Sequence, residues 1–193
     1  MSSEVLNMAQ KENQRIALTK KLLQEGLLRL LEAKTLDRIS VTELCRESGI
    51  NRATFYNHYT SPQDLLTDVE KRITAELQKA ISEPRSAMDA LRETEAVCNF
   101  FAEHARIIPI LHRCHADDSI ADSLYTLNEN FQSFRASRNF ARTLDQDGIY
   151  LVSVFFHTGT YHILLEWIRT GMKKSPRELA ELMIRLAAEN FLE

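Results

Sequence analysis

The sequence predicts an all-α protein of about nine helices. Apolar residues recur at three- and four-residue spacing along nearly every segment, and no segment shows the alternation of a convincing strand. Glycine and proline are few, 5 and 4 among 193 residues, which favours helices over turn-rich β structure. We expect an N-terminal three-helix domain at residues 1–60 and a C-terminal helical bundle domain at residues 61–193.

The composition is that of a globular protein, with 44% hydrophobic and 26% charged residues. No run of about 18 apolar residues occurs, so we expect no membrane-spanning helix. Residues 1–15 contain no apolar signal core, which predicts a cytoplasmic protein. Cys45, Cys98 and Cys114 are widely spaced and form no CxxC pair, so we expect free thiols in a reducing compartment.

Charge is distributed unevenly within the net charge of −3. Residues 1–60 hold 9 Lys and Arg against 7 Asp and Glu, whereas residues 61–193 hold 15 against 20. A mildly basic N-terminal domain on an acidic body is compatible with binding of a polyanion by the N-terminal part.

The N-terminal domain is predicted to contain one long helix and two short ones. Residues 10–34 carry a single apolar stripe formed by Ile16, Leu23, Leu27, Leu30 and Leu31. Ser40 with Glu43 three residues later is a capping box, which starts the second helix. Gly49 ends that helix, since it can take the left-handed conformation, and Asn51 is a preferred N-cap for the third helix.

Two short helices joined at a glycine form a helix-turn-helix pattern. In the third helix, predicted at 52–58, Phe55 and Tyr59 are four residues apart and are assigned to the inner face. This assignment leaves Arg52, Ala53, Tyr56 and Asn57 outward or on the flanks. Arginine can hold a guanine edge or a phosphate, alanine can meet a thymine methyl, and tyrosine and asparagine can donate to phosphates. The pattern therefore predicts a recognition helix for the DNA major groove.

The C-terminal domain is predicted from capping signals and apolar periodicity. Ser61-Pro62 and Ser175-Pro176 each place proline at the first helical position, with an acidic residue in the same turn. The segment DQDG at 145–148 predicts a turn. The predicted helices are 62–80, 85–105, 107–115, 118–140, 149–170 and 176–192.

The penultimate helix, 149–170, is apolar nearly all round and must be buried on most sides. Gly159 in its middle costs about 1 kcal/mol relative to alanine, so we expect it to permit close approach of another helix. This helix and the last one predict a homodimer interface with a second copy, and packing within one chain is the alternative. The predicted interface residues are Phe155, Gly159, His162, Trp167, Leu179, Leu182 and Leu186.

The remaining chemical signals are weaker. His112 and His115 are three residues apart with Cys114 off their face, and since zinc needs three or four convergent ligands we expect no metal and no cofactor. Aromatic residues at helical spacing are core more often than pocket, but one set could line an effector cavity: Phe100, Phe101, His104, Phe131 and Phe134. No nucleophile–base pair, glycine-rich phosphate loop or paired carboxylates appear, so we expect no enzymatic activity.

The segment SVTELCRESGINRATFYNHYTSPQDLL, residues 40–66, resembles the DNA-binding segment of the TetR family of transcriptional regulators. The C-terminal segment 155–186, FFHTGTYHILLEWIRTGMKKSPRELAELMIRL, resembles one branch of the same family. The matching positions of the first segment are Ser40, Leu44, Cys45, Ser48, Gly49, Ile50, Asn51, Phe55, Tyr56, Tyr59 and Leu65. Pro62 stands where the family holds a phosphate-binding lysine. That contact is therefore missing, or it moves to Thr60, Ser61 or the amides of Gln63 and Asp64.

The resemblance implies a dimeric regulator, most often a repressor, which binds a palindromic double-stranded DNA operator and is released by a small-molecule effector. It implies base contacts from Thr42, Arg52, Ala53 and Tyr56, and backbone contacts from Ser40, Thr54, Asn57 and His58. Asn51 completes the predicted DNA-binding set. The alternative is a ligand-sensing co-regulator of the same fold with weak or no direct DNA binding, which Pro62 and the low basic charge suggest.

Overall fold

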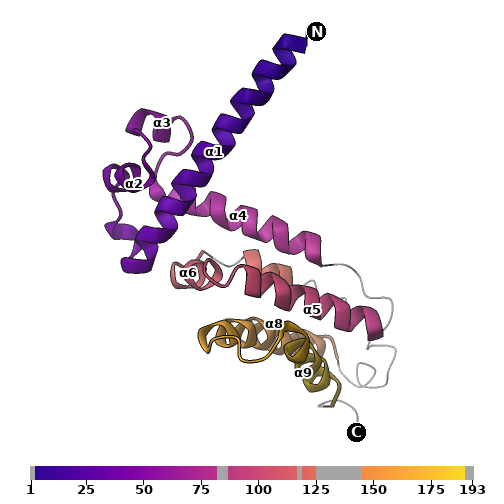
Figure 1. Ribbon diagram of the computed structural model, residues 1–193. Helices are drawn as coiled ribbons and strands as arrows, with labels where there is room; N and C mark the ends of the chain where they lie inside the picture. Colours follow the sequence, from indigo (N-terminus) through magenta and orange to yellow (C-terminus); the bar gives the residue numbers. More distant parts are fainter. Residues whose placement is uncertain (1–2, 82–86, 117–118, 125–144, 190–193) are drawn as a thin grey trace. The chain divides into compact units, whose positions relative to one another are not determined.

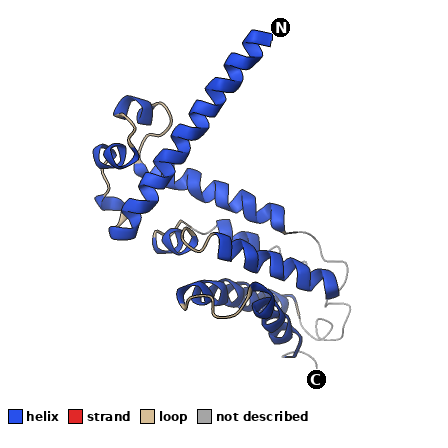
Figure 2. Ribbon diagram, viewed as in Figure 1, coloured by secondary structure: helices blue, strands red, loops and turns tan. Residues whose placement is uncertain are grey.

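The computed structural model describes residues 3–81, 87–116, 119–124 and 145–189 (Figure 1). Within these ranges every regular element is a helix, and Figure 2 shows helices joined by loops with no strand in the part described. The all-α prediction is confirmed for these residues. The helix predicted at 118–140 falls mostly outside them, and only its residues 119–124 are described, as helix.

The chain divides into two compact units, Met1–Glu70 (unit 1) and Lys71–Glu193 (unit 2). The division falls within one helix, α4, which runs from Pro62 to Ala80. The functional boundary expected near residue 60 stays a prediction.

Unit 1 contains α1 (Ser3–Ala33), a 3-10 helix η1 (Leu36–Arg38), α2 (Val41–Ser48), α3 (Arg52–Tyr56) and the first part of α4. The predicted order of one long and two short helices is confirmed. The third helix is shorter than predicted, because it ends at Tyr56 rather than at residue 58.

The helix ends of unit 1 follow the chemistry of their capping residues. Ser40 Oγ accepts from the Glu43 amide at 3.2 Å, and Asn51 Oδ1 accepts from the Thr54 amide at 2.8 Å. Gly49 takes a left-handed conformation with φ 69°, which explains glycine at the turn between α2 and α3. The capping box is only half formed, because the Glu43 carboxylate binds Lys34 Nζ at 2.6 Å instead of the Ser40 amide.

The core of unit 1 is built on the α1 leucine stripe. The fully buried residues of this core, each no more than 1% exposed, are Leu23, Leu27, Leu28, Leu31, Leu44, Phe55, Leu65, Leu66 and Val69. Gly26 lets α1 and α2 approach closely, since a Cβ at this position would lie 3.0 Å from the Ser48 Cβ. The two short helices are therefore held on one side of α1 by close packing.

Unit 2 contains the rest of α4 and the helices α5 (Ala87–Glu103), α6 (Ile108–Arg113), α8 (Gln146–Arg169) and α9 (Pro176–Glu189). Helix α5 packs against both α8 and α9. The buried residues at the centre of this unit include Val97, Cys98, Phe101, Ile108, Leu111, Leu164 and Ala180.

The starts of α8 and α9 show one wrong prediction and one confirmed signal. Residues 145–148 are not a separate turn: Asp145 is the N-cap of α8, and its Oδ1 accepts from the Gly148 amide at 2.9 Å. At α9 the Ser175 amide and hydroxyl both donate to Glu178, each at 2.7 Å, and these bonds lower the pKa of the Glu178 carboxyl. Ser175-Pro176 therefore does begin a helix, as predicted.

Candidate nucleic-acid interface

Helix α3 has one buried and one exposed face. Phe55 is 0% exposed and Tyr59, just beyond the helix, is 4% exposed, so their assignment to the inner face is confirmed. Most of the predicted DNA-contacting residues of this segment are solvent exposed: Asn51, Arg52, Ala53, Tyr56 and Asn57. Thr54 and His58 are half-buried on its flanks.

The N-terminal turn of α2 supplies the other two predicted contacts. Ser40 and Thr42 are both exposed there, and α2 packs directly against α3. The caps leave donors for a ligand. The Asn51 side chain keeps its amide N–H groups and Ser40 keeps its hydroxyl hydrogen, because both side chains act only as acceptors in the caps.

Arg52 and Tyr56 form a stacked pair on the exposed face of α3. The guanidinium carbon of Arg52 lies 6.0 Å from the centroid of the Tyr56 ring, within the range of a cation–π contact. The Tyr56 ring is in turn held edge-on to buried Phe55, with centroids 5.5 Å apart. Arg52 therefore has a neighbouring ring that limits its freedom before any ligand binds.

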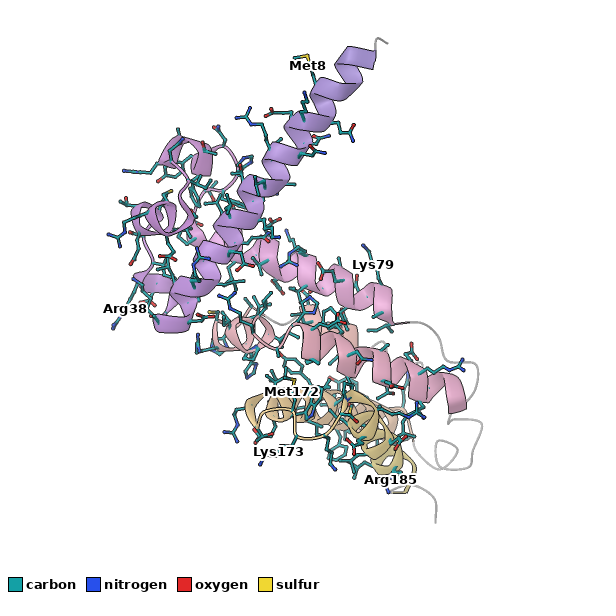
Figure 3. The ribbon with its side chains drawn as sticks, in the orientation of Figure 1. Met8, Arg38, Lys79, Met172, Lys173 and Arg185 are labelled. Carbon is teal, nitrogen blue, oxygen red and sulfur yellow. The ribbon has the colours of Figure 1, made fainter. Side chains whose placement is uncertain are left out.

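Several cations of unit 1 are already paired with its own carboxylates. Arg29 binds Glu47 at 2.6 Å and Lys34 binds Glu43 at 2.6 Å. Arg46 keeps a side chain that is 82% exposed, with only a 3.9 Å approach to Glu43. Figure 3 labels Arg38 and Met8, which extend from η1 and from the N-terminal part of α1.

At the start of α4, several of the donors that were predicted to replace a phosphate-binding lysine are bonded within the chain. The Thr60 amide and hydroxyl both donate to Asp64 Oδ2, at 2.9 and 3.2 Å, and the Asp64 amide donates to Ser61 Oγ at 3.2 Å. These bonds engage three of the donors that could have replaced the missing lysine at Pro62. They also fix a carboxylate at this helix end, where it suits the helix dipole but repels phosphate.

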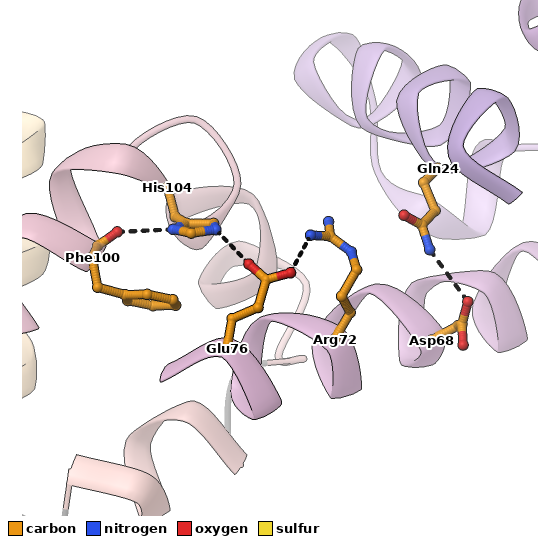
Figure 4. A network of polar contacts seen from close by, with 6 residues as sticks. All are labelled: Gln24, Asp68, Arg72, Glu76, Phe100 and His104. Carbon is orange, nitrogen blue, oxygen red and sulfur yellow. Dashed lines mark hydrogen bonds and ion pairs between the residues drawn. The ribbon is translucent and has the colours of Figure 1, made fainter. Parts of the chain in front are cut away.

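Asp68 on α4 contacts three side chains that the sequence did not single out as a group, and Figure 4 shows one of them, Gln24. Its Oδ2 accepts from Tyr59 Oη at 2.6 Å and from Gln24 Nε2 at 3.2 Å, and it lies 3.6 Å from Lys20 Nζ. Burial opposes ionisation of Asp68, but these three neighbours outweigh it and lower the pKa of its carboxyl. Burial and the bond to Asp68 raise the pKa of Tyr59.

The predicted effector-cavity residues that are described lie together at the C-terminal end of α5. Phe100 and Phe101 are buried, and the His104 ring stacks on Phe100 with centroids 4.3 Å apart. In Figure 4, His104 bridges the Phe100 carbonyl and the Glu76 carboxylate, at 2.9 and 3.0 Å. Phe131 and Phe134 lie outside the described residues, so the cavity stays a prediction.

The predicted dimer-interface residues divide by exposure. Trp167 is 7% exposed with its indole N–H bonded to the Lys174 carbonyl at 2.9 Å, and Leu179 is 3% exposed. Both are buried in unit 2 within one chain, and their place in an interface with a second copy stays a prediction. Phe155, His162 and Leu186 are exposed, whereas Gly159 and Leu182 are half-buried.

Part of the exposed apolar surface of α8 was not predicted from the sequence. Tyr150, Leu151 and Val154 are 62%, 64% and 38% exposed, beside Phe155 at 68%. Gly159 has open space where a Cβ would stand, so no helix of the described chain approaches it closely. Figure 3 labels Met172 and Lys173, which lie in the loop between α8 and α9.

The described residues show neither a metal site nor a membrane-spanning helix. No three His, Cys, Asp or Glu side chains within the described ranges converge as metal ligands. No helix of the described part is long and apolar enough to cross a membrane.

The two-helix motif and the helical unit that follows it define the class of helix-turn-helix regulators. A family model of TetR type, described as a transcriptional regulator C-terminal region, matches residues 90–189, more than half of the chain. The chain therefore belongs to the TetR family of transcriptional regulators, as the resemblance in the sequence indicated.

One curated relative is YxbF of Bacillus subtilis (strain 168), described as an uncharacterized HTH-type transcriptional regulator. It is 27% identical over 124 residues, which is 63% of this chain and 33% of the relative. The chain thus spans about a third of the length of this relative, and the activity of the whole protein is a matter for proposal.

Solved structures share the fold. A TetR transcriptional regulator from Streptococcus agalactiae 2603V has a TM-score of 0.65 at 16% identity, covering 92% of this chain and 98% of that one. The dihydroxyacetone kinase operon activator DhaS has a TM-score of 0.56 at 17% identity, covering 90% and 96%. At such identities the likeness concerns the fold alone.

Proposed function

We propose that this protein is a DNA-binding transcription regulator that binds a palindromic operator as a homodimer. The observation that carries the proposal is the two-sided α3, whose inner face is fixed by Phe55 and Tyr59 while Arg52 and Tyr56 stand exposed. Such a helix can enter the major groove without unfolding any part of unit 1.

In this proposal the exposed side chains divide between bases and backbone. Arg52 holds a guanine edge, Ala53 packs on a thymine methyl, and Tyr56 and Thr42 complete the base-facing set. The hydroxyl and amide donors of the remaining residues bind phosphate oxygens and set the register on the duplex. Those residues are Ser40, Asn51, Thr54, Asn57 and His58.

The exposed apolar surface of α8 supports the homodimer. Tyr150, Leu151 and Phe155 are each more than 60% exposed. All three lie on α8 before Gly159, so the proposed interface runs along this helix from these residues to Gly159. Contiguous exposed apolar surface of this kind marks an interaction site. A two-fold contact between copies would bury it on both sides at once and would give a two-fold symmetric reader for a palindrome.

The proposal also covers whether the protein represses or activates transcription, and what releases it from DNA. We take repression, with release by a small-molecule effector bound in unit 2, as the mode that the family resemblance implies. DhaS, which shares the fold, is an operon activator. In this proposal, the position of the operator relative to the promoter decides whether binding represses or activates transcription. A chromosomal operator places the protein in the cytoplasm, and regulation by binding requires no enzymatic activity.

The competing function is a co-regulator of the same fold that binds DNA weakly or not at all. The occupied donors at the start of α4 favour it, because Thr60 and Asp64 leave this helix end with a carboxylate and no cation.

Fluorescence anisotropy with a labelled duplex separates the two functions. The regulator prefers one palindrome over a scrambled duplex at low salt, and its affinity falls linearly with log salt. Tyr56→Ala should weaken binding to that palindrome, because Tyr56 is more than half exposed at the groove-facing side. Equal and weak binding of both duplexes at low salt would support the co-regulator instead.

A further inference from the structure

Three side chains near the junction between the recognition helix and α4 reach one oxygen atom, Asp68 Oδ2. Tyr59, which follows α3, donates its hydroxyl hydrogen to this atom at 2.6 Å. Two side chains of α1 reach the same atom: Gln24 Nε2 at 3.2 Å and Lys20 Nζ at 3.6 Å. One carboxylate oxygen thus joins α1, α4 and the turn that ends the helix-turn-helix.

The contact extends inward to the recognition helix through two neighbouring rings tilted by 44°. Tyr59 is 4% exposed, and its ring centroid lies 6.0 Å from that of Phe55, the fully buried anchor of α3. Lys20 Nζ lies 5.4 Å from the centroid of the Tyr59 ring, so the same lysine holds both the ring and the carboxylate. A displacement of Tyr59 would therefore shift Phe55 and, with it, the exposed residues of α3.

The protonation states of the pair match the geometry. Burial raises the pKa of Tyr59, so its hydroxyl stays a donor across the neutral range. The Tyr59, Lys20 and Gln24 contacts lower the pKa of Asp68 against the effect of burial, so its carboxyl stays an acceptor. Among the described residues of unit 1, the Tyr59 hydroxyl donates to no other acceptor, so removal of the Asp68 acceptor would leave a buried donor unsatisfied.

We propose that Asp68 is a positioning residue for operator readout: by holding Tyr59 it fixes the orientation of α3 before DNA is bound. The proposal rests on the proposed DNA-binding function. Specific binding requires side chains on α3 to meet base edges in one geometry, and an unfixed helix must be ordered during binding. Non-specific binding depends on cations and phosphates and does not require that geometry.

The test uses Asp68→Asn, Tyr59→Phe and the double variant in the whole 193-residue chain. Asp37→Asn is the matched control, because Asp37 is an exposed carboxylate of η1 in the same unit and loses the same charge. Affinity for the operator and for a scrambled duplex is measured at several salt concentrations. Tyr59→Phe removes the donor of this bond, and Asp68→Asn removes the negative charge that strengthens it. We expect each single variant to bind the operator about 5- to 150-fold more weakly, the range for loss or weakening of a hydrogen bond to a charged group.

Three further results are expected from the same proteins. Binding to the scrambled duplex and the salt slope should match those of Asp37→Asn. The double variant should bind the operator no more weakly than the weaker single variant, because both changes break one contact. In thermal unfolding without DNA, the losses in melting temperature from the two single changes should likewise fail to add.

Distinct outcomes overturn distinct statements. Unchanged operator affinity in both single variants overturns the positioning role, and so does an equal loss on operator and scrambled duplex, which indicates only a lower folded fraction. Additive losses in melting temperature show that the two residues do not form the contact. Absence of operator preference in the unsubstituted protein overturns the proposed function and the positioning role with it, even where the thermal losses fail to add.

Discussion

Replacing Pro62 by lysine should strengthen binding to every DNA sequence and steepen its salt dependence. The start of α4 offers phosphate no cation, and Thr60 and Asp64 have three donors engaged within the chain. A lysine at this first helical position adds one phosphate contact per protomer and two per homodimer, which steepens the slope of log affinity against log salt by about 1.8. Between about 50 and 200 mM salt, the affinity gain of the variant should therefore shrink by about 12-fold.

The change also removes a proline that suits the first helical turn, and this should destabilise the fold by about 0.4–1 kcal/mol. Pro176→Lys is the matched control, since Ser175-Pro176 starts α9 with the same sequence pattern and the substitution adds the same charge in unit 2. Fluorescence anisotropy at four or more salt concentrations gives the two slopes, and thermal unfolding gives the two stabilities.

The Pro62→Lys variant should show a steeper slope than the original protein, and Pro176→Lys should not. An unchanged slope for Pro62→Lys would refute the placement of the α4 start at the DNA backbone. An equal increase in both variants would show that only the overall charge of the protein matters.

Other predictions follow from single residues. Arg52→Ala should weaken operator binding by about 1–3 kcal/mol and relax the preference for one guanine, measured by anisotropy on base-substituted duplexes. Because the folded-state pKa of Asp68 lies below its ordinary value of 3.8, its stabilisation is full above that value and is lost as the pH falls through the folded-state value. Urea unfolding should accordingly show a cost of Asp68→Asn at pH 7 that declines as the pH falls below 3.8. Phe155→Glu should convert a dimer to monomers in sedimentation equilibrium, whereas Met8→Glu, at an exposed apolar residue of α1, should not.

The parts of the fold that the sequence predicted well are those fixed by local chemistry. Ser40, Gly49 and Asn51 act within four residues of themselves, so their roles as caps and turn can be recognised from their order alone. The inner placement of Phe55 and Tyr59 follows from helical spacing in the same way. Residues 40–59 were therefore predicted nearly completely.

The parts that the sequence could not predict depend on distant partners. Asp68 is a carboxylate in a helix of ordinary composition, and only folding brings Gln24, 44 residues away, to its Oδ2. Trp167 and Leu179 have the same apolar character as Phe155, and their burial depends on packing within unit 2. A turn and a helix N-cap use the same residue types, so the chemistry of Asp145 could not separate them.

The central claim is that this chain reads a two-fold symmetric DNA site through α3. Selection of bound duplexes from a random library, at low salt and with the unsubstituted protein, tests it most directly. We predict enrichment of a palindrome whose half-site centres lie about one helical turn, or a multiple of it, apart. Recovery of duplexes with no shared motif, under conditions where the protein is folded, would contradict the claim.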